Sequence, residues 1–107
     1  MSIEALEAKV IEWAYDRGIF AGSTDHTRWE KLMEELGEFT DAAWPDEAER
    51  NMEDVKLEAG DVLVTLINIL HPYNLDLETC LAAAYNKIKN RTGQMVNGTY
   101  VKSEDLP

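Results

Sequence analysis

The chain is organised around residues 31–61, which read KLMEELGEFTDAAWPDEAERNMEDVKLEAGD. Two acidic pairs stand out in this stretch, each with members three residues apart, and a further glutamate directly precedes the first pair. Because residues three apart lie on one face of an α-helix, each pair presents its carboxylates together if its segment is helical. The acids are Glu34, Glu35 and Glu38 in the first segment and Glu58 and Asp61 in the second.

The second acidic pair leads into the most apolar run of the chain, residues 62–70. Apolar residues surround nearly the whole circumference of this run, which indicates a helix that is buried along most of its C-terminal half. Thr65 and Asn68 are polar exceptions, and they follow Glu58 and Asp61 along one helix face. Carboxylates at the start of a buried helix lose hydration, which is unfavourable unless a cation or another partner compensates for it.

If the two helices pack antiparallel, Glu35, Glu38, Glu58 and Asp61 converge on one small volume. Such carboxylates repel one another unless a metal ion neutralises them. Oxygen ligands on stiff helices, with room for water and phosphate, suit Mg²⁺, and Mn²⁺ is a candidate substitute. We therefore predict that these four residues are metal ligands. The alternative is that all the acids are surface charges on acidic helices.

The paired acidic motif resembles the EExxE…ExxD signature of the MazG-like, all-α nucleoside triphosphate pyrophosphohydrolases. In this sequence the signature is carried by residues 34–38 and 58–61, and the likeness covers residues 24–98. Three further features follow the family pattern: the residues next to the acids, a basic segment on the last helix, and a tail similar to that of compact, single-domain phage-type members. These features occupy residues 31–33, 60–63, 68, 86–91 and 91–98.

The resemblance implies a Mg²⁺-dependent enzyme that cleaves (deoxy)nucleoside triphosphates to the monophosphate and pyrophosphate, by attack of water on the α-phosphorus. Glu34, Glu35 and Glu38 are then the candidate catalytic residues, since one carboxylate of the cluster can serve as the general base. Related hydrolases of phosphoribosyl-ATP or alarmone polyphosphates stay open. The non-enzymatic alternative is an acidic helical protein that mimics DNA. It is less favoured, because a mimic needs its carboxylates outward and these are phased with apolar positions.

Three cations are candidates for contacts to the substrate phosphates. Lys87 and Arg91 are four residues apart, so they share one helix face and can bind a phosphate group together. Lys31 precedes the first acids by one helical turn. The alternative for Lys87 and Arg91 is ordinary surface charge near a helix C-terminus, where cations are favoured without a ligand.

Five further residues are candidates for contacts to the base or sugar, and each has a structural alternative. Asn68 is either a substrate contact or a core amide with its hydrogen bonds satisfied. Thr65 can instead bond its own helix backbone. Trp13, Trp29 and Trp44 can stack on a base, although tryptophans at helical spacing usually belong to a core.

The composition favours an acidic, single-domain protein of the cytoplasm. We assign all 107 residues to one domain. The chain has 10 Lys plus Arg against 21 Asp plus Glu, and this net charge of -11 disfavours nucleic acids and anionic membranes as partners. A single cysteine, Cys80, excludes an internal disulfide and suggests a reducing compartment. Residues 1–4 lack the features of a secretory signal, and the run 62–70 is too short to span a bilayer.

The expected architecture is an all-α, four-helix bundle-type fold with a short C-terminal hairpin or extended tail. The turn signal Asn97-Gly98 places the hairpin within the tail. The third helix is apolar around too much of its circumference for a small monomer, so we expect a homodimer or homotetramer. The predicted helices span residues 3–17, 25–43, 47–71 and 77–92, with a tail over 93–107 and a loop over 19–23. The alternative for residues 47–54 is a separate turn before the third helix.

Overall fold

The computed structural model describes all 107 residues, and most of them are helical. The chain forms two compact units, residues 1–77 and 78–107, which are described separately, and its assignment to one domain stays a prediction. The all-α class with a C-terminal hairpin is confirmed. The α-helices and strands are α1 (Ile3–Asp16), α2 (Ile19–Gly22), α3 (Asp25–Ala43), α4 (Met52–Leu70), α5 (Leu77–Ile88), β1 (Gly93–Val96) and β2 (Thr99–Lys102).

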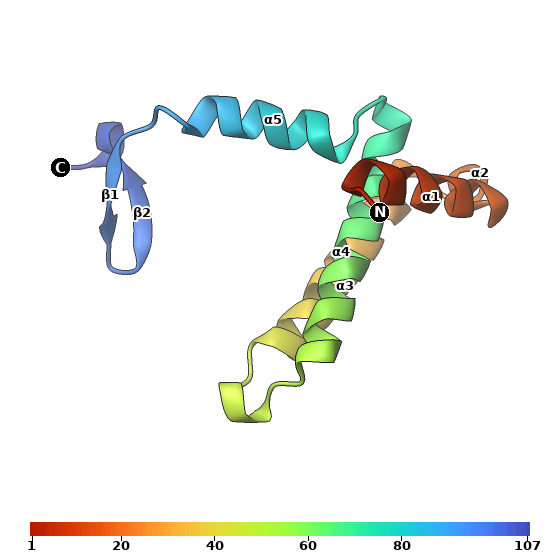
Figure 1. Cartoon of the computed structure of the whole chain (residues 1–107), viewed down its shortest axis with the longest axis horizontal. Helices are drawn as coiled ribbons and strands as arrows, with labels where there is room; N and C mark the ends of the chain where they lie inside the picture. The colour runs from red at the N-terminus through yellow and green to blue at the C-terminus, as the bar shows by residue number, and fades with distance from the viewer. The chain divides into compact units, whose positions relative to one another are not determined.

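The first unit is built on α3 and α4, which lie side by side and run in opposite directions (Figure 1). Residues 44–51 join them at one end. Thr24 caps α3 reciprocally: its hydroxyl accepts the backbone N–H of Thr27 at 3.1 Å, and the Thr27 hydroxyl accepts the N–H of Thr24 at 2.9 Å. The antiparallel pairing predicted for these two helices is therefore present.

The start of α4 differs from the sequence prediction. The predicted helix over 47–71 begins only at Met52, and Glu47–Glu49 forms a separate 3-10 turn. The side chain of Asn51 accepts the backbone N–H groups of Glu53 and Asp54 at 3.0 and 3.3 Å, so Asn51 is the cap. Asp46 makes no such bond. Asp46 and Asn51 are both residue types that favour a helix N-cap, and Asn51 is the one that caps α4.

Two other boundaries also differ. The segment 19–23 predicted as a loop contains the single-turn helix α2, because Gly18 adopts a left-handed conformation with φ 70° and lets the chain turn helical again. The helix predicted over 77–92 ends at Ile88, where the N–H of Arg91 bonds back to the Ile88 carbonyl at 2.9 Å. Hydrogen bonds between residues three apart commonly tighten the last turn of a helix.

Aromatic contacts hold α1 and α2 against the C-terminal end of α4. The Tyr15 hydroxyl lies 2.8 Å from Nε2 of His71. The Phe20 ring packs against both partners, with its centroid 4.7 Å from that of Tyr15 and 5.1 Å from that of His71. The buried carboxylate of Glu7 accepts the backbone N–H of Leu77 at 3.1 Å. These contacts fix the N-terminal helix on the helical hairpin.

The core of the chain is small. Its buried apolar residues are Ala14, Ile67 and Ile69, and no large side chain is completely buried. Thr65 and Asn68 are buried as well, so all the buried residues of α4 lie in its C-terminal half, as predicted. Many large apolar side chains are exposed elsewhere. None of the helices has the length and apolar character required to cross a bilayer.

The second unit contains most of α5 and the predicted hairpin. β1 and β2 pair antiparallel, with Val96 opposite Thr99. Asn97 and Gly98 connect them with positive φ angles of 52° and 84°, the geometry that the Asn-Gly dipeptide favours in a two-residue turn. The hairpin around Asn97-Gly98 is therefore confirmed.

Candidate functional site

The acids of α3 and α4 meet across the helical hairpin. Glu35 belongs to two groups whose potential ligand oxygens lie within 4.8 Å of one another. The first group stays on α3, and the second connects α3 with α4. The structure thus brings together all five acids that the sequence singled out. The groups are Glu34, Glu35 and Glu38, and Glu35, Glu58 and Asp61.

Two of these carboxylates carry buried oxygens without a partner. Glu35 is only 7% exposed, and Oε2 of Glu35 and Oε2 of Glu58 are both buried without a hydrogen bond. Nζ of Lys31 lies 3.2 Å from Oε1 of Glu35 and 3.3 Å from Oε2 of Glu34, so it serves only one oxygen of the buried carboxylate. Unpaired buried carboxylate oxygens are unfavourable, and a divalent cation satisfies them. The donor set therefore fits a hard metal ion such as Mg²⁺.

The charges of the cluster also affect its titration. Hydrogen bonding to the Glu35 carboxyl, together with the negative charge of Glu35, raises the pKa of Glu38 above its ordinary value. Hydrogen bonds to Glu35 and Glu34 raise the pKa of Lys31. In both cases the hydrogen bond to Glu35 is the largest cause, and the negative charge of the neighbouring glutamates adds to it. A proton or a cation at this position relieves the repulsion.

A cavity of about 470 Å³ adjoins the acids. Its lining includes Glu35 and Asp61 from the cluster, and Asn68 further along α4. Asn68 is 8% exposed, and its Oδ1 is buried without a hydrogen bond. Thr65 also lines the cavity, but its hydroxyl donates to the carbonyl of Val62 at 2.8 Å. Thr65 thus makes the backbone bond that its structural alternative describes, whereas Asn68 is not a satisfied core amide.

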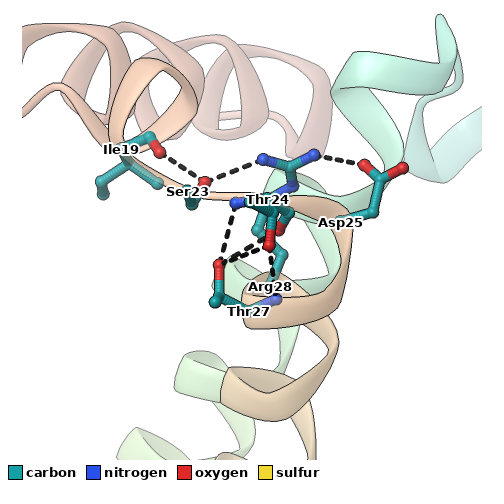
Figure 2. A network of polar contacts seen from close by, with 6 residues as sticks. All are labelled: Ile19, Ser23, Thr24, Asp25, Thr27 and Arg28. Atoms are coloured by element: carbon teal, nitrogen blue, oxygen red, sulfur yellow. Dashed lines mark hydrogen bonds and ion pairs between the residues drawn. The ribbon is translucent and has the colours of Figure 1, made fainter.

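A polar network forms the part of the cavity wall where α2 passes into α3 (Figure 2). The Arg28 guanidinium donates to the Ser23 hydroxyl at 2.8 Å and to the Asp25 carboxylate. The Ser23 hydroxyl in turn donates to the carbonyl of Ile19. Sequence reasoning missed Arg28, although it precedes Lys31 and Glu35 by three and seven residues and so lies on their helix face.

The candidate tryptophans lie in different surroundings. Trp29 is 49% exposed and is not among the residues that line the cavity, whereas Trp13 of α1 lines it. Helical spacing within α3 cannot show which residues of α1 line the cavity. Trp13 reaches the cavity through the packing of α1 on α4.

The remaining predicted cations lie in the second unit. Lys87 and Arg91 line a separate cavity of about 400 Å³ that is formed entirely within residues 78–107. Lys102 of β2 joins them there, and its Nζ lies 3.5 Å from the Glu104 carboxylate. Three cations and one acid around one cavity suit an anion. The role of Lys87 and Arg91 as phosphate contacts remains a proposal.

Comparison with known families identifies the domain. The MazG nucleotide pyrophosphohydrolase domain matches residues 23–96. The chain belongs to the MazG family. The MazG match contains the five acids, Asn68 and the cations Lys87 and Arg91, whereas α1 and α2 precede it. No curated protein and no solved structure matches the chain.

Proposed function

We propose that the protein is a Mg²⁺-dependent pyrophosphohydrolase that converts (deoxy)nucleoside triphosphates to monophosphates and pyrophosphate. Membership of the MazG family supports the reaction class. The observation that carries the proposal is the pair of buried, unpartnered oxygens on Glu35 and Glu58 next to a cavity. An acidic surface without a ligand has no physical reason to bury such atoms.

In this proposal Glu35, Glu38, Glu58 and Asp61 hold the metal. Mg²⁺ bound there would neutralise the phosphates and lower the pKa of a bound water, and Mn²⁺ would be a substitute. Glu34 is exposed and already paired with Lys31, so it is suited to orienting a water molecule from the edge of the cluster.

Glu38 is the better candidate for the general base that takes the proton from the attacking water. Its carboxylate is exposed at the edge of the cluster, where a water molecule can reach it. Glu35 is buried and engaged with Lys31, so it is better suited to holding a cation.

The proposed substrate contacts fall into two groups, those to the phosphates and those to the base or sugar. Lys31, Lys87 and Arg91 are proposed to bind the phosphates, and Asn68 the base or sugar. Asn68 has the strongest support, because its buried amide oxygen has no partner within the protein.

The inward position of Glu35 and Glu58 favours an enzyme over a DNA mimic. A mimic needs carboxylates spread over the surface, whereas Glu35 is buried and Glu58 is half-buried. Hydrolases of phosphoribosyl-ATP or of alarmone polyphosphates use the same kind of anhydride cleavage, and they differ in the molecule that occupies the cavity.

A substrate panel tests the proposal. Nucleoside triphosphates, phosphoribosyl-ATP and an alarmone polyphosphate are incubated with the full chain and Mg²⁺, and pyrophosphate and orthophosphate are quantified separately. We expect pyrophosphate from at least one triphosphate and its loss in Glu38→Gln and Asp61→Asn. Glu30→Gln is the control, because Glu30 lies on α3 but pairs with His26 outside the cluster. Release of orthophosphate, or full activity in both cluster variants, would overturn the proposal.

A further inference from the structure

Part of the cavity wall comes from residues that the MazG match does not include. Trp13 of α1 and Ile19 of α2 line the cavity, and both precede residue 23, where the match begins. Val64 of α4 adds a third apolar side chain. The cavity therefore combines an acidic metal site with an apolar surface supplied largely by the N-terminal helices.

The polar side chains of this wall are mostly occupied. Arg28 and Ser23 bond within the network of Figure 2, and the Thr27 hydroxyl is used in capping α3. Thr65 bonds to its own helix. Asn68 differs from these residues, because its buried Oδ1 has no partner. An amide that is 8% exposed and whose oxygen is unpaired is stabilised when a ligand supplies a hydrogen-bonding edge.

Trp13 supplies the complementary feature. Its side chain is 45% exposed although it lines a cavity, so part of a large aromatic surface stays in contact with water. A planar ring that covers this surface is stabilised by stacking and by the removal of apolar area from water. A flat heterocycle with a hydrogen-bonding edge satisfies Trp13 and Asn68 together, and a nucleobase is such a group.

We propose that Trp13 contacts the nucleobase of the substrate, and that α1 and α2 thereby determine base selectivity. The inference rests on the proposed function, since it assigns the base of the same nucleotide whose phosphates meet the metal site. The wall is held in place before a ligand arrives: Tyr15, two residues after Trp13, is bonded to His71, and Arg28 fixes the segment that follows α2. Such preorganisation limits the entropy lost on binding.

Binding measurements with the full chain and Mg²⁺ test this assignment. The probes are an α,β-methylene nucleoside triphosphate, which resists cleavage, and inorganic tripolyphosphate, which lacks a base. We expect Trp13→Ala to weaken binding of the nucleotide by about tenfold, a typical effect of removing a base–aromatic contact. Tripolyphosphate binding should not change. Trp13→Phe should restore most of the nucleotide affinity, because phenylalanine also offers a ring face.

Two other tryptophans serve for comparison. Trp44→Ala is the control, because Trp44 is highly exposed and does not line the cavity. Trp29→Ala tests the residue that the sequence favoured. Equal loss of nucleotide and tripolyphosphate binding in Trp13→Ala would indicate a structural role and overturn the inference, as would unchanged nucleotide binding or an effect confined to Trp29→Ala. Failure of the unsubstituted protein to bind or cleave any nucleotide would instead refute the proposed function.

Discussion

Neutralising Glu35 is expected to make the metal-free protein more stable while removing its stabilisation by Mg²⁺. In Glu35→Gln the side chain keeps its size but loses its charge. The new amide group donates hydrogen bonds, so it can serve the neighbouring carboxylate oxygens that now lack a partner, including Oε2 of Glu58. The substitution therefore replaces repulsion with attraction.

The size of the effect follows from the contacts. A buried polar atom without a partner destabilises a protein by about 1–3 kcal/mol, and more when it is charged. The substitution also removes the ion pair with Lys31, whose amine is half-exposed, and such exposed pairs contribute about 0–1 kcal/mol. We expect a net gain of about 1–2 kcal/mol, which corresponds to a rise in Tm of roughly 4–8 °C in a chain of this size.

Thermal unfolding followed by far-ultraviolet circular dichroism measures both effects, in EDTA and then in Mg²⁺. The unsubstituted protein should gain stability with Mg²⁺, by about 2.7 kcal/mol at a concentration 100 times the Kd, and Glu35→Gln should gain much less. Glu30→Gln removes one glutamate charge from the exposed face of α3 and is the matched control. A Glu35→Gln protein that melts below the unsubstituted protein in EDTA would refute the reasoning, because Lys31 would then compensate the buried charge fully.

Three further outcomes are expected. The raised pKa of Glu38 contributes stability that is present in full below the ordinary value of 4.5 and is lost as the pH rises through the raised value. The metal-free protein should therefore resist urea better as the pH falls from neutrality towards 4.5. Glu38→Gln should flatten this trend. Lys87→Ala and Arg91→Ala should each raise KM for a nucleoside triphosphate. Lys89→Ala should leave KM unchanged, because this side chain does not line the cavity that Lys87 and Arg91 line. Equal effects at all three positions would indicate that only the net charge of the unit matters. Light scattering after size-exclusion chromatography should give a homodimer or homotetramer, and a monomer at all concentrations would contradict the oligomer proposed from the exposed apolar side chains.

The sequence predicted the helices and the acid cluster well because both depend on local spacing. The pairing of Glu35 with Glu58 and Asp61 follows from two helical motifs and one short connection, and the structure contains it. For the start of α4 the sequence left two readings open, and the separate turn before the helix is the one present, because Asn51 and not Asp46 caps α4.

The cavity lining was only partly predictable for a different reason. Periodicity tells which residues of one helix share a face, and it identified Asn68 on the face of the α4 acids. It does not tell which residues of a separate helix arrive at that face. Trp13 lies on α1 and reaches the cavity only through the packing between helices, so its position could not be separated from that of Trp29 by sequence alone.

The sparse interior of the chain has a thermodynamic consequence. Ala14, Ile67 and Ile69 are the buried apolar residues of a chain whose larger apolar side chains are mostly in contact with solvent. In the proposed oligomer, a second copy would cover part of this apolar surface and so add to the driving force for folding. Folding and self-association would then be one linked equilibrium, and dilution alone would weaken both.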